Sequence, residues 1–117
     1  MDIKVKKNDN DVYLVQLKGS LDLYSSHKLK DLLMKMVENK AERFIISMLD
    51  VNSINSSGIG ALIYIFSTLK KLNNPLIILA TDGPVLQALE ITRLKNYFNI
   101  VGTLKEALAL AADGQAD

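Results

Sequence analysis

Cysteine is absent from the 117 residues of this chain, and histidine occurs once, at His27. These gaps exclude disulfides, thiolate metal ligands, cysteine nucleophiles and any metal site built from several histidines. An excess of one charge is missing as well, because 14 lysine and arginine residues nearly balance 13 aspartate and glutamate residues. The net charge of +1 creates no overall field that attracts nucleic acid or an anionic membrane. We therefore expect no metal and no direct binding to either.

Long hydrophobic runs are scarce. The longest, residues 59–66, is far shorter than the ~20 residues of a membrane-spanning helix. The first eleven residues, MDIKVKKNDND, are too polar for a secretory signal peptide. A composition of 49% apolar and 23% charged residues is typical of a folded domain. We expect a cytoplasmic protein with one domain over residues 1–112 and a frayed tail over residues 113–117.

The chain contains an alternation of strand-like and helix-like segments. Strands are predicted at 3–7, 12–19, 44–49 and 76–80, with a short last strand within 97–101. Helices are predicted from Ser25 or Ser26 to about Glu38, from Ser56 or Ser57 to Leu72, from Pro84, and after the capping residue Thr103. The order β-β-α-β-α-β-α-(β)-α predicts an α/β fold. Its mixed, mainly parallel sheet has four to five strands, with about four helices and an antiparallel hairpin at one edge.

The helix predicted over residues 56–72 carries more apolar residues than one buried stripe requires. Its core face consists of Ile59, Leu62, Ile63, Phe66 and Leu69. A neighbouring face holds Ala61, Ile65 and Leu72, with Thr68 among them. That second face either packs against another helix or, if it is exposed, offers a surface to a partner protein.

The segment INSSGIGALI, residues 54–63, changes abruptly from small polar residues to apolar ones. In a parallel sheet it lies at the carboxyl edge, where sites form in open α/β folds. Asn55, Ser56 and Ser57 are good capping residues, and capping alone explains them. Alternatively, a hydroxyl here accepts a phosphate, which the free N–H groups and positive end of the helix would stabilise. The residues by themselves leave both interpretations open.

Other kinds of chemistry find little support. Gly58 and Gly60 lack the third glycine of a dinucleotide-binding loop, because position 63 is isoleucine, and the P-loop lysine is missing. A hydrolase pairing Ser56 with His27 would lack the G-x-S-x-G nucleophile turn. We therefore expect neither an enzyme nor a cofactor.

Two stretches carry a resemblance to a known family. Residues 19–22, Gly-Ser-Leu-Asp, resemble the G-x-L-D that follows the second strand of STAS domains. Residues 54–60, Ile-Asn-Ser-Ser-Gly-Ile-Gly, resemble the serine loop of the single-domain anti-sigma factor antagonists within that family. Softer agreement over residues 84–108 extends the resemblance to nearly the whole chain.

The resemblance implies a function and a site. It makes Ser56 the phosphoacceptor, with Ser57 a lesser candidate, and places Asp22 near the phosphorylation loop. The implied partner-binding residues are Asp22, Asn55, Ser56, Ser57, Gly58 and Ile59. The implied partner is an anti-sigma factor that is also a serine kinase of the histidine-kinase-like ATPase fold. The unphosphorylated antagonist binds this kinase, phosphorylation releases it, and a PP2C-type phosphatase restores binding. Transcription is regulated indirectly.

The sequence departs from the family pattern at two places. Asn55 stands where the family has an aspartate, and Ser47-Met48-Leu49 replaces the usual Asp-Leu-Ser. Asparagine caps a helix about as well as aspartate but carries no charge. The alternative is therefore a STAS module that is not phosphorylated, such as a scaffold of a signalling complex or a subunit of a lipid transport complex.

Overall fold

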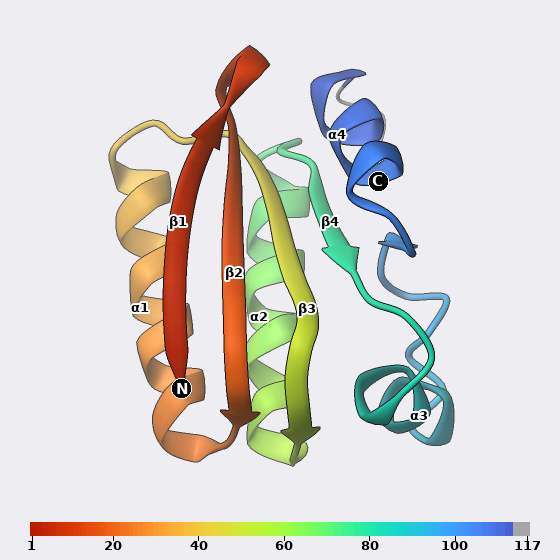
Figure 1. The fold of residues 1–117 in the computed structure, drawn as a ribbon. Helices are drawn as coiled ribbons and strands as arrows, with labels where there is room; N and C mark the ends of the chain where they lie inside the picture. Colours follow the sequence, from red (N-terminus) through yellow and green to blue (C-terminus); the bar gives the residue numbers. More distant parts are fainter. Residues whose placement is uncertain (114–117) are drawn as a thin grey trace.

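A computed structural model describes residues 1–113 of the chain (Figure 1). Its elements are β1 (Asp2–Asn8), η1 (Asp9–Asp11), β2 (Val12–Leu21), α1 (Leu23–Glu38), β3 (Arg43–Ile54), α2 (Ser56–Lys71), β4 (Leu76–Leu79), α3 (Pro84–Ile91), β5 (Ile100–Val101) and α4 (Leu104–Asp113). The expected tail lies outside the described residues, apart from Asp113, where α4 ends.

The strands form one sheet in the order β1-β2-β3-β4-β5, which is also their order along the chain. β1 pairs with β2 antiparallel, and each later strand is parallel to the one before it. The hairpin, the mainly parallel sheet and the predicted element order are thus confirmed. The short η1 link uses left-handed backbone at Asn10 (φ 64°) and Asp11 (φ 58°), which these two residue types tolerate better than most.

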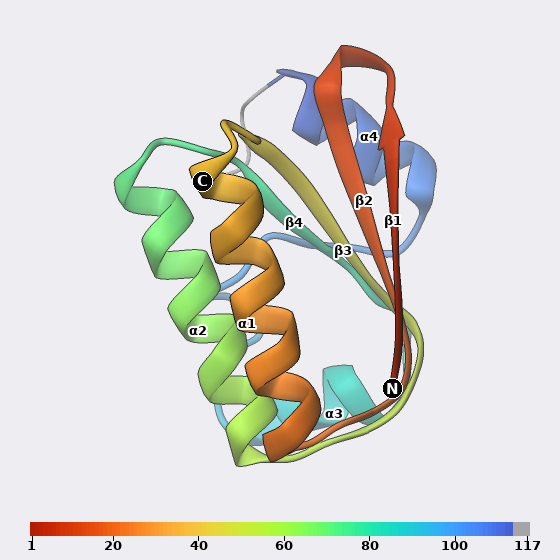
Figure 2. The ribbon, with the colours of Figure 1, turned by 90° about the vertical axis from the view of Figure 1, so that its left-hand side faces the viewer.

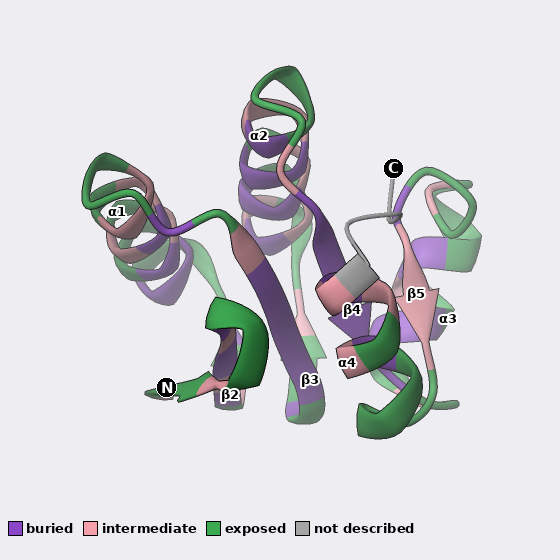
Figure 3. Ribbon diagram, turned by 90° about the horizontal axis from the view of Figure 1, so that it is seen from above, coloured by how far each residue is buried: buried purple, intermediate pink, exposed green. Residues whose placement is uncertain are grey.

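Helices cover both faces of the sheet (Figure 2). α1, α2 and α3 share the larger apolar core with one face of β2 and β3, while α4 covers a smaller core on the opposite face. β3 and β4 lie between these layers, and Figure 3 shows them as largely buried. The nearly continuous apolar runs of these two strands follow from that double cover. Leu76 to Leu79 are all buried.

β3 is longer than its apolar run predicts. The sequence indicates a strand over 44–49 followed by a loop, but the strand continues to Ile54. Two register shifts against β2, between Gln16 and Lys18 and between Gly19 and Ser20, interrupt the alternation of the side chains. Because bulges break the period of two, this extension has no apolar pattern to reveal it. The prediction that this strand ends at residue 49 is therefore wrong.

The N-cap of α1 lies three or four residues earlier than predicted. Its N-cap is Asp22, not Ser25 or Ser26, and the helix starts at Leu23. Ser25 is the third helical residue, where it completes a capping box with Asp22. Both serines are buried, because Ser25 and Ser26 face inward once the helix has started at Leu23.

The two apolar faces of α2 are both used for packing. Leu62, Phe66 and Leu69 of the predicted core face are buried, whereas its other two members, Ile59 and Ile63, are only partly buried. On the neighbouring face Ile65 is fully buried in the core cluster that also contains residues of α1. α1 packs alongside α2, as Figure 2 shows. Of the two explanations left open by the sequence, packing is right for Ala61 and Ile65, whereas Leu72, at the end of the helix, is 50% exposed.

Candidate functional site

The loops that start α1 and α2 lie side by side at the carboxyl edge of the sheet (Figure 1). Leu21 and Ile54, the last residues of β2 and β3, are register partners. The Asn55 N–H then donates to the Leu21 carbonyl at 3.2 Å. Asp22 and Ser56 are 34 positions apart in the sequence. The structure brings their two loops to the same edge of the sheet.

Gly19 and neighbouring hydroxyls shape the approach to α1. Gly19 has φ of 111°, a left-handed conformation that favours glycine, next to the second register shift. Ser53 Oγ donates to Ser20 Oγ at 2.9 Å, and Ser20 Oγ donates to Asn52 Oδ1 at 3.1 Å. This exposed network ties the ends of β2 and β3 together. No residue pattern in the sequence predicts these pairings, although the density of serine and asparagine over 50–57 is a signal of a polar network.

The first turn of α1 is closed by reciprocal hydrogen bonds. The Ser25 N–H donates to Asp22 Oδ1 at 3.0 Å, and the Asp22 N–H donates to Ser25 Oγ at 2.9 Å. The Ser25 hydroxyl also lies 2.8 Å from the Ser20 carbonyl. The hydrogen bond from the Ser25 N–H is the main cause that holds the pKa of the Asp22 carboxyl below its ordinary value of 3.8. Asp22 is therefore an ionised capping group at neutral pH.

The first turn of α2 has a side-chain cap but no reciprocal capping box. Asn55 is its N-cap, and Asn55 Oδ1 accepts a hydrogen bond from the Gly58 N–H at 3.1 Å. Ser56 and Ser57 are the first two helical residues, so they do not serve as the cap that the sequence allowed. Ser56 is exposed and Ser57 is half-buried. Within residues 1–113 the Ser56 hydroxyl has no hydrogen-bond partner.

Gly58 seats this turn against β2. A Cβ at position 58 would lie 2.8 Å from the Leu21 carbonyl oxygen and 2.8 Å from Ile54 Cγ1. Only glycine allows α2 to approach the end of β2 this closely. Packing as well as hydrogen bonding therefore holds the segment Asn55–Ile59 beside Asp22. Ile59 is half-buried.

The hydrolase alternative requires a contact that is not formed. His27 is an exposed residue of α1. It lines a groove together with Ser57, but across the described chain no hydrogen bond joins His27 to either serine. Residues 1–113 also hold no group of three or more histidine, aspartate or glutamate side chains placed to bind a metal ion.

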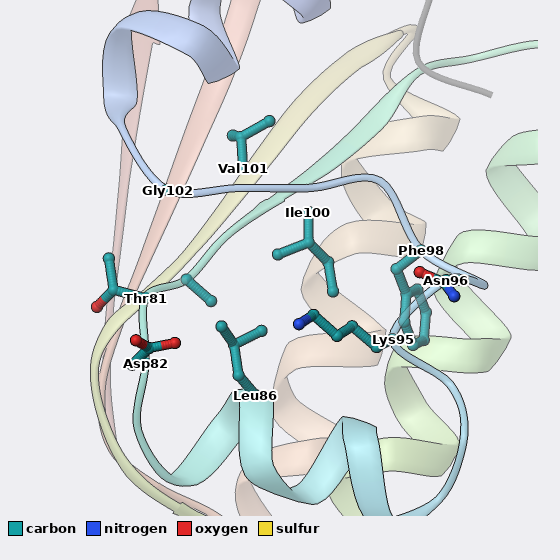
Figure 4. Close-up of a pocket in the computed structure, with 10 residues that line it drawn as sticks. Thr81, Asp82, Leu86, Lys95, Asn96, Phe98, Ile100, Val101 and Gly102 are labelled. Carbon is teal, nitrogen blue, oxygen red and sulfur yellow. The ribbon is translucent and has the colours of Figure 1, made fainter.

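A larger pocket of about 530 Å³ opens elsewhere, between α3 and β5 (Figure 4). Its floor is apolar, formed by Leu86, Phe98 and Ile100. Lys95 reaches into it, but the Lys95 ammonium pairs with Glu90 at 3.1 Å. This pocket contains none of the predicted site residues. Among residues 1–113, no helix is both long and apolar enough to cross a lipid bilayer.

The geometry agrees with comparisons to known proteins. Over 100 residues, the chain is 29% identical to the anti-sigma-B factor antagonist of Bacillus subtilis, covering 86% of this chain and 90% of that protein. Its fold is similar to that of an anti-sigma factor antagonist from Mycobacterium paratuberculosis, with a TM-score of 0.84 and 21% identity over 94% of this chain and 92% of that one. It is also similar to the Bacillus cell fate determinant SpoIIAA in the phosphorylated form, with a TM-score of 0.71 and 16% identity over 92% and 97% of the two chains.

The family model of the STAS domain matches residues 2–107, which include β1 and both helix starts. The resemblance carried by residues 19–22 and 54–60 is thereby confirmed, and the chain belongs to the STAS domain family.

Proposed function

We propose that this protein is an anti-sigma factor antagonist controlled by phosphorylation of Ser56. In the unphosphorylated state it binds an anti-sigma factor that is also a serine kinase, and phosphorylation releases it. A PP2C-type phosphatase returns it to the binding state. The protein acts in the cytoplasm as a binding module and regulates transcription indirectly, without contacting nucleic acid itself.

The observation that carries this proposal is the position of the Ser56 hydroxyl. It is exposed on the first residue of α2, beside the Asp22 loop, and is free of hydrogen bonds within the described chain. A kinase can therefore reach it without unfolding the helix. Two relatives support the same function, one named as an antagonist of an anti-sigma factor and one known in a phosphorylated form.

The helix start is suited to hold the phosphate once it is attached. The N–H groups of Ser56 and Ser57 have no acceptor within the helix, because they belong to its first turn. They and the helix dipole favour a negative charge at this position. A phosphate adds about 1.5 to 2 negative charges at neutral pH. The switch therefore needs little change in the shape of the domain.

Release of the partner follows from the cost of burying that charge. An interface centred on Ser56 removes water from its surroundings. A charge that an interface buries without a cation opposite it destabilises a complex by several kcal/mol, on the order of a thousandfold or more in affinity. The Asp22 carboxylate on the neighbouring helix start is ionised at neutral pH and adds repulsion toward the phosphate.

Intact-mass measurement tests the acceptor. The purified protein is incubated with the cognate anti-sigma factor kinase and ATP, alongside Ser56→Ala and the matched control Ser57→Ala. One added phosphate on wild type and Ser57→Ala, and none on Ser56→Ala, is the expected result. Full labelling of Ser56→Ala would overturn the assignment, and an unmodified wild type would overturn the switch.

One observation favours a second candidate, a STAS module that is not switched. Asn55 supplies the cap without the charge found in the family, so kinase and phosphatase have one fewer charge to recognise. Binding of the partner by Ser56→Asp separates the two functions. A switched antagonist loses affinity in this variant, whereas an unswitched scaffold binds equally well with serine, alanine or aspartate at position 56.

A further inference from the structure

A groove of about 300 Å³ runs between α1 and α2, next to the proposed phosphorylation site. Leu23, Ser26 and Lys30 line it from α1, and Gly60 and Tyr64 line it from α2. Ser57 also borders the groove, so it continues the surface on which Ser56 is exposed. The proposed function uses none of these groove residues of α1.

Gly60 leaves the groove open although the fold does not require glycine there. A Cβ at position 60 meets no atom within 4 Å, whereas a Cβ at position 58 would lie 2.8 Å from the Leu21 carbonyl oxygen. Glycine inside a helix is destabilising relative to alanine, because it loses more backbone entropy on folding. Packing within the chain thus explains Gly58 but not Gly60. A surface kept free of side chains at this point suits close approach by the main chain of another protein.

Ser26 is one of the residues along the same groove, and its hydroxyl is buried there without a hydrogen-bond partner among residues 1–113. The residue is 5% exposed. A buried polar atom left without a partner is destabilising, and such atoms are uncommon in folded proteins.

The rim of the groove is basic and partly apolar. Lys30 Nζ lies 4.7 Å from the centre of the Tyr64 ring, and His27 lies one turn earlier on α1. Leu23 is 60% exposed and Tyr64 is 48% exposed, which are large values for apolar side chains on a small domain. A cation beside apolar walls is complementary to a carboxylate carried next to an apolar residue.

We propose that this groove docks an acidic segment of the anti-sigma factor. The carboxylate of an aspartate or glutamate pairs with the Lys30 ammonium at the rim of the groove. An adjacent apolar side chain packs between Leu23 and Tyr64, and the main chain of the segment passes over Gly60. This inference rests on the proposed function, and it identifies the partner by the chemistry of its docking segment.

Affinity measurements on groove variants test the inference. The purified cognate anti-sigma factor is titrated against wild type, Gly60→Leu and Lys30→Glu. Matched controls are Gly102→Leu, at a second glycine whose added Cβ meets no atom within 4 Å, and Lys28→Glu, an equal charge change on the exposed side of α1. Both groove variants are expected to bind about tenfold or more weakly, and both controls as wild type. Thermal unfolding checks that Gly60→Leu and Lys30→Glu remain folded.

The outcomes separate the inference from the function on which it rests. If wild type binds and the groove variants bind equally well, the docking inference is overturned and the antagonist function stands. If wild type does not bind, both are overturned. Where wild type binds, photo-crosslinking from p-benzoylphenylalanine at position 64 identifies the partner peptide that lies in the groove. Crosslinks to a partner peptide that contains aspartate or glutamate support the inference, and crosslinks only to peptides without an acidic residue contradict it.

Discussion

The starts of α1 and α2 share one capping geometry but differ in what they do. Both helices have 16 residues, follow parallel neighbouring strands and are capped by a side-chain oxygen that accepts from the third helical N–H. At α1 that cap is a carboxylate in a reciprocal capping box with a buried serine. At α2 it is an uncharged amide, and the first serine is exposed. The closed start stabilises the fold, whereas the open start leaves a hydroxyl available for modification.

The largest effect is expected from disturbing the close contact between the start of α2 and the end of β2. Gly58→Ala places a methyl group 2.8 Å from the Leu21 carbonyl oxygen, so the backbone of one element must move. We expect the free energy of unfolding to fall by about 1–3 kcal/mol, as for other overpacked sites. Urea unfolding followed by circular dichroism measures it. An unchanged unfolding midpoint would mean that α2 does not depend on this close approach.

Removal of the α2 cap has a smaller expected effect. Asn55→Ala deletes the acceptor of the Gly58 N–H and should destabilise the protein by about 1 kcal/mol. Asn55→Asp keeps the acceptor and adds a charge that the helix dipole favours, so its stability should equal or slightly exceed that of wild type. The pair of variants shows whether position 55 is structural, since a loss in both would contradict the capping role.

Gly60→Ala should change stability in the opposite direction from Gly58→Ala. With no atom within 4 Å of the new Cβ, the variant gains the helix propensity of alanine without a clash. An increase of about 0.5–1 kcal/mol in the free energy of unfolding is expected. The same urea measurement decides this, with Gly58→Ala as its matched partner. A loss of stability at position 60 would show that the groove between α1 and α2 is more tightly packed than the structure indicates.

The smallest expected effect is on the pH dependence of the free energy of unfolding, and it comes from the start of α1 alone. Because the pKa of Asp22 is lowered in the folded protein, its capping contribution is fully present above the ordinary value of 3.8. It is lost as pH falls from 3.8 through the lower folded-state pKa. Asp22→Asn should therefore flatten the pH dependence of the unfolding free energy in that window. Asn55→Ala should leave that slope unchanged, because the α2 cap does not titrate.

The sequence was sufficient for the fold wherever a hydrophobic period ran unbroken. The strands at 12–19 and 76–80 and the helix from Ser56 appear close to where the apolar pattern indicates. The predicted ends of elements were wrong where polar residues extend a strand or cap a helix. Bulges hide the strand beyond Leu49, and the choice of Asp22 over Ser25 as cap depends on a reciprocal bond that spacing alone does not rank.

The candidate site was predictable as a segment but not as a surface. The motif resemblance indicated both Asp22 and Ser56, and the structure brings their loops together through the bond from Asn55 to Leu21. The groove beside them was not foreseen. Its walls come from two helices, so the unpaired Ser26 hydroxyl and the space above Gly60 exist only once α1 has packed on α2.

The order of the strands in the sheet has a consequence for how the chain reaches this structure. Every strand pairs with the strand that precedes it in the sequence, so each new segment adds to an edge that already exists. Loop closures stay short, and no strand has to insert between two others. Assembly can therefore advance in the direction of synthesis, and the segments that form both helix starts are synthesised before β4, β5 and α4.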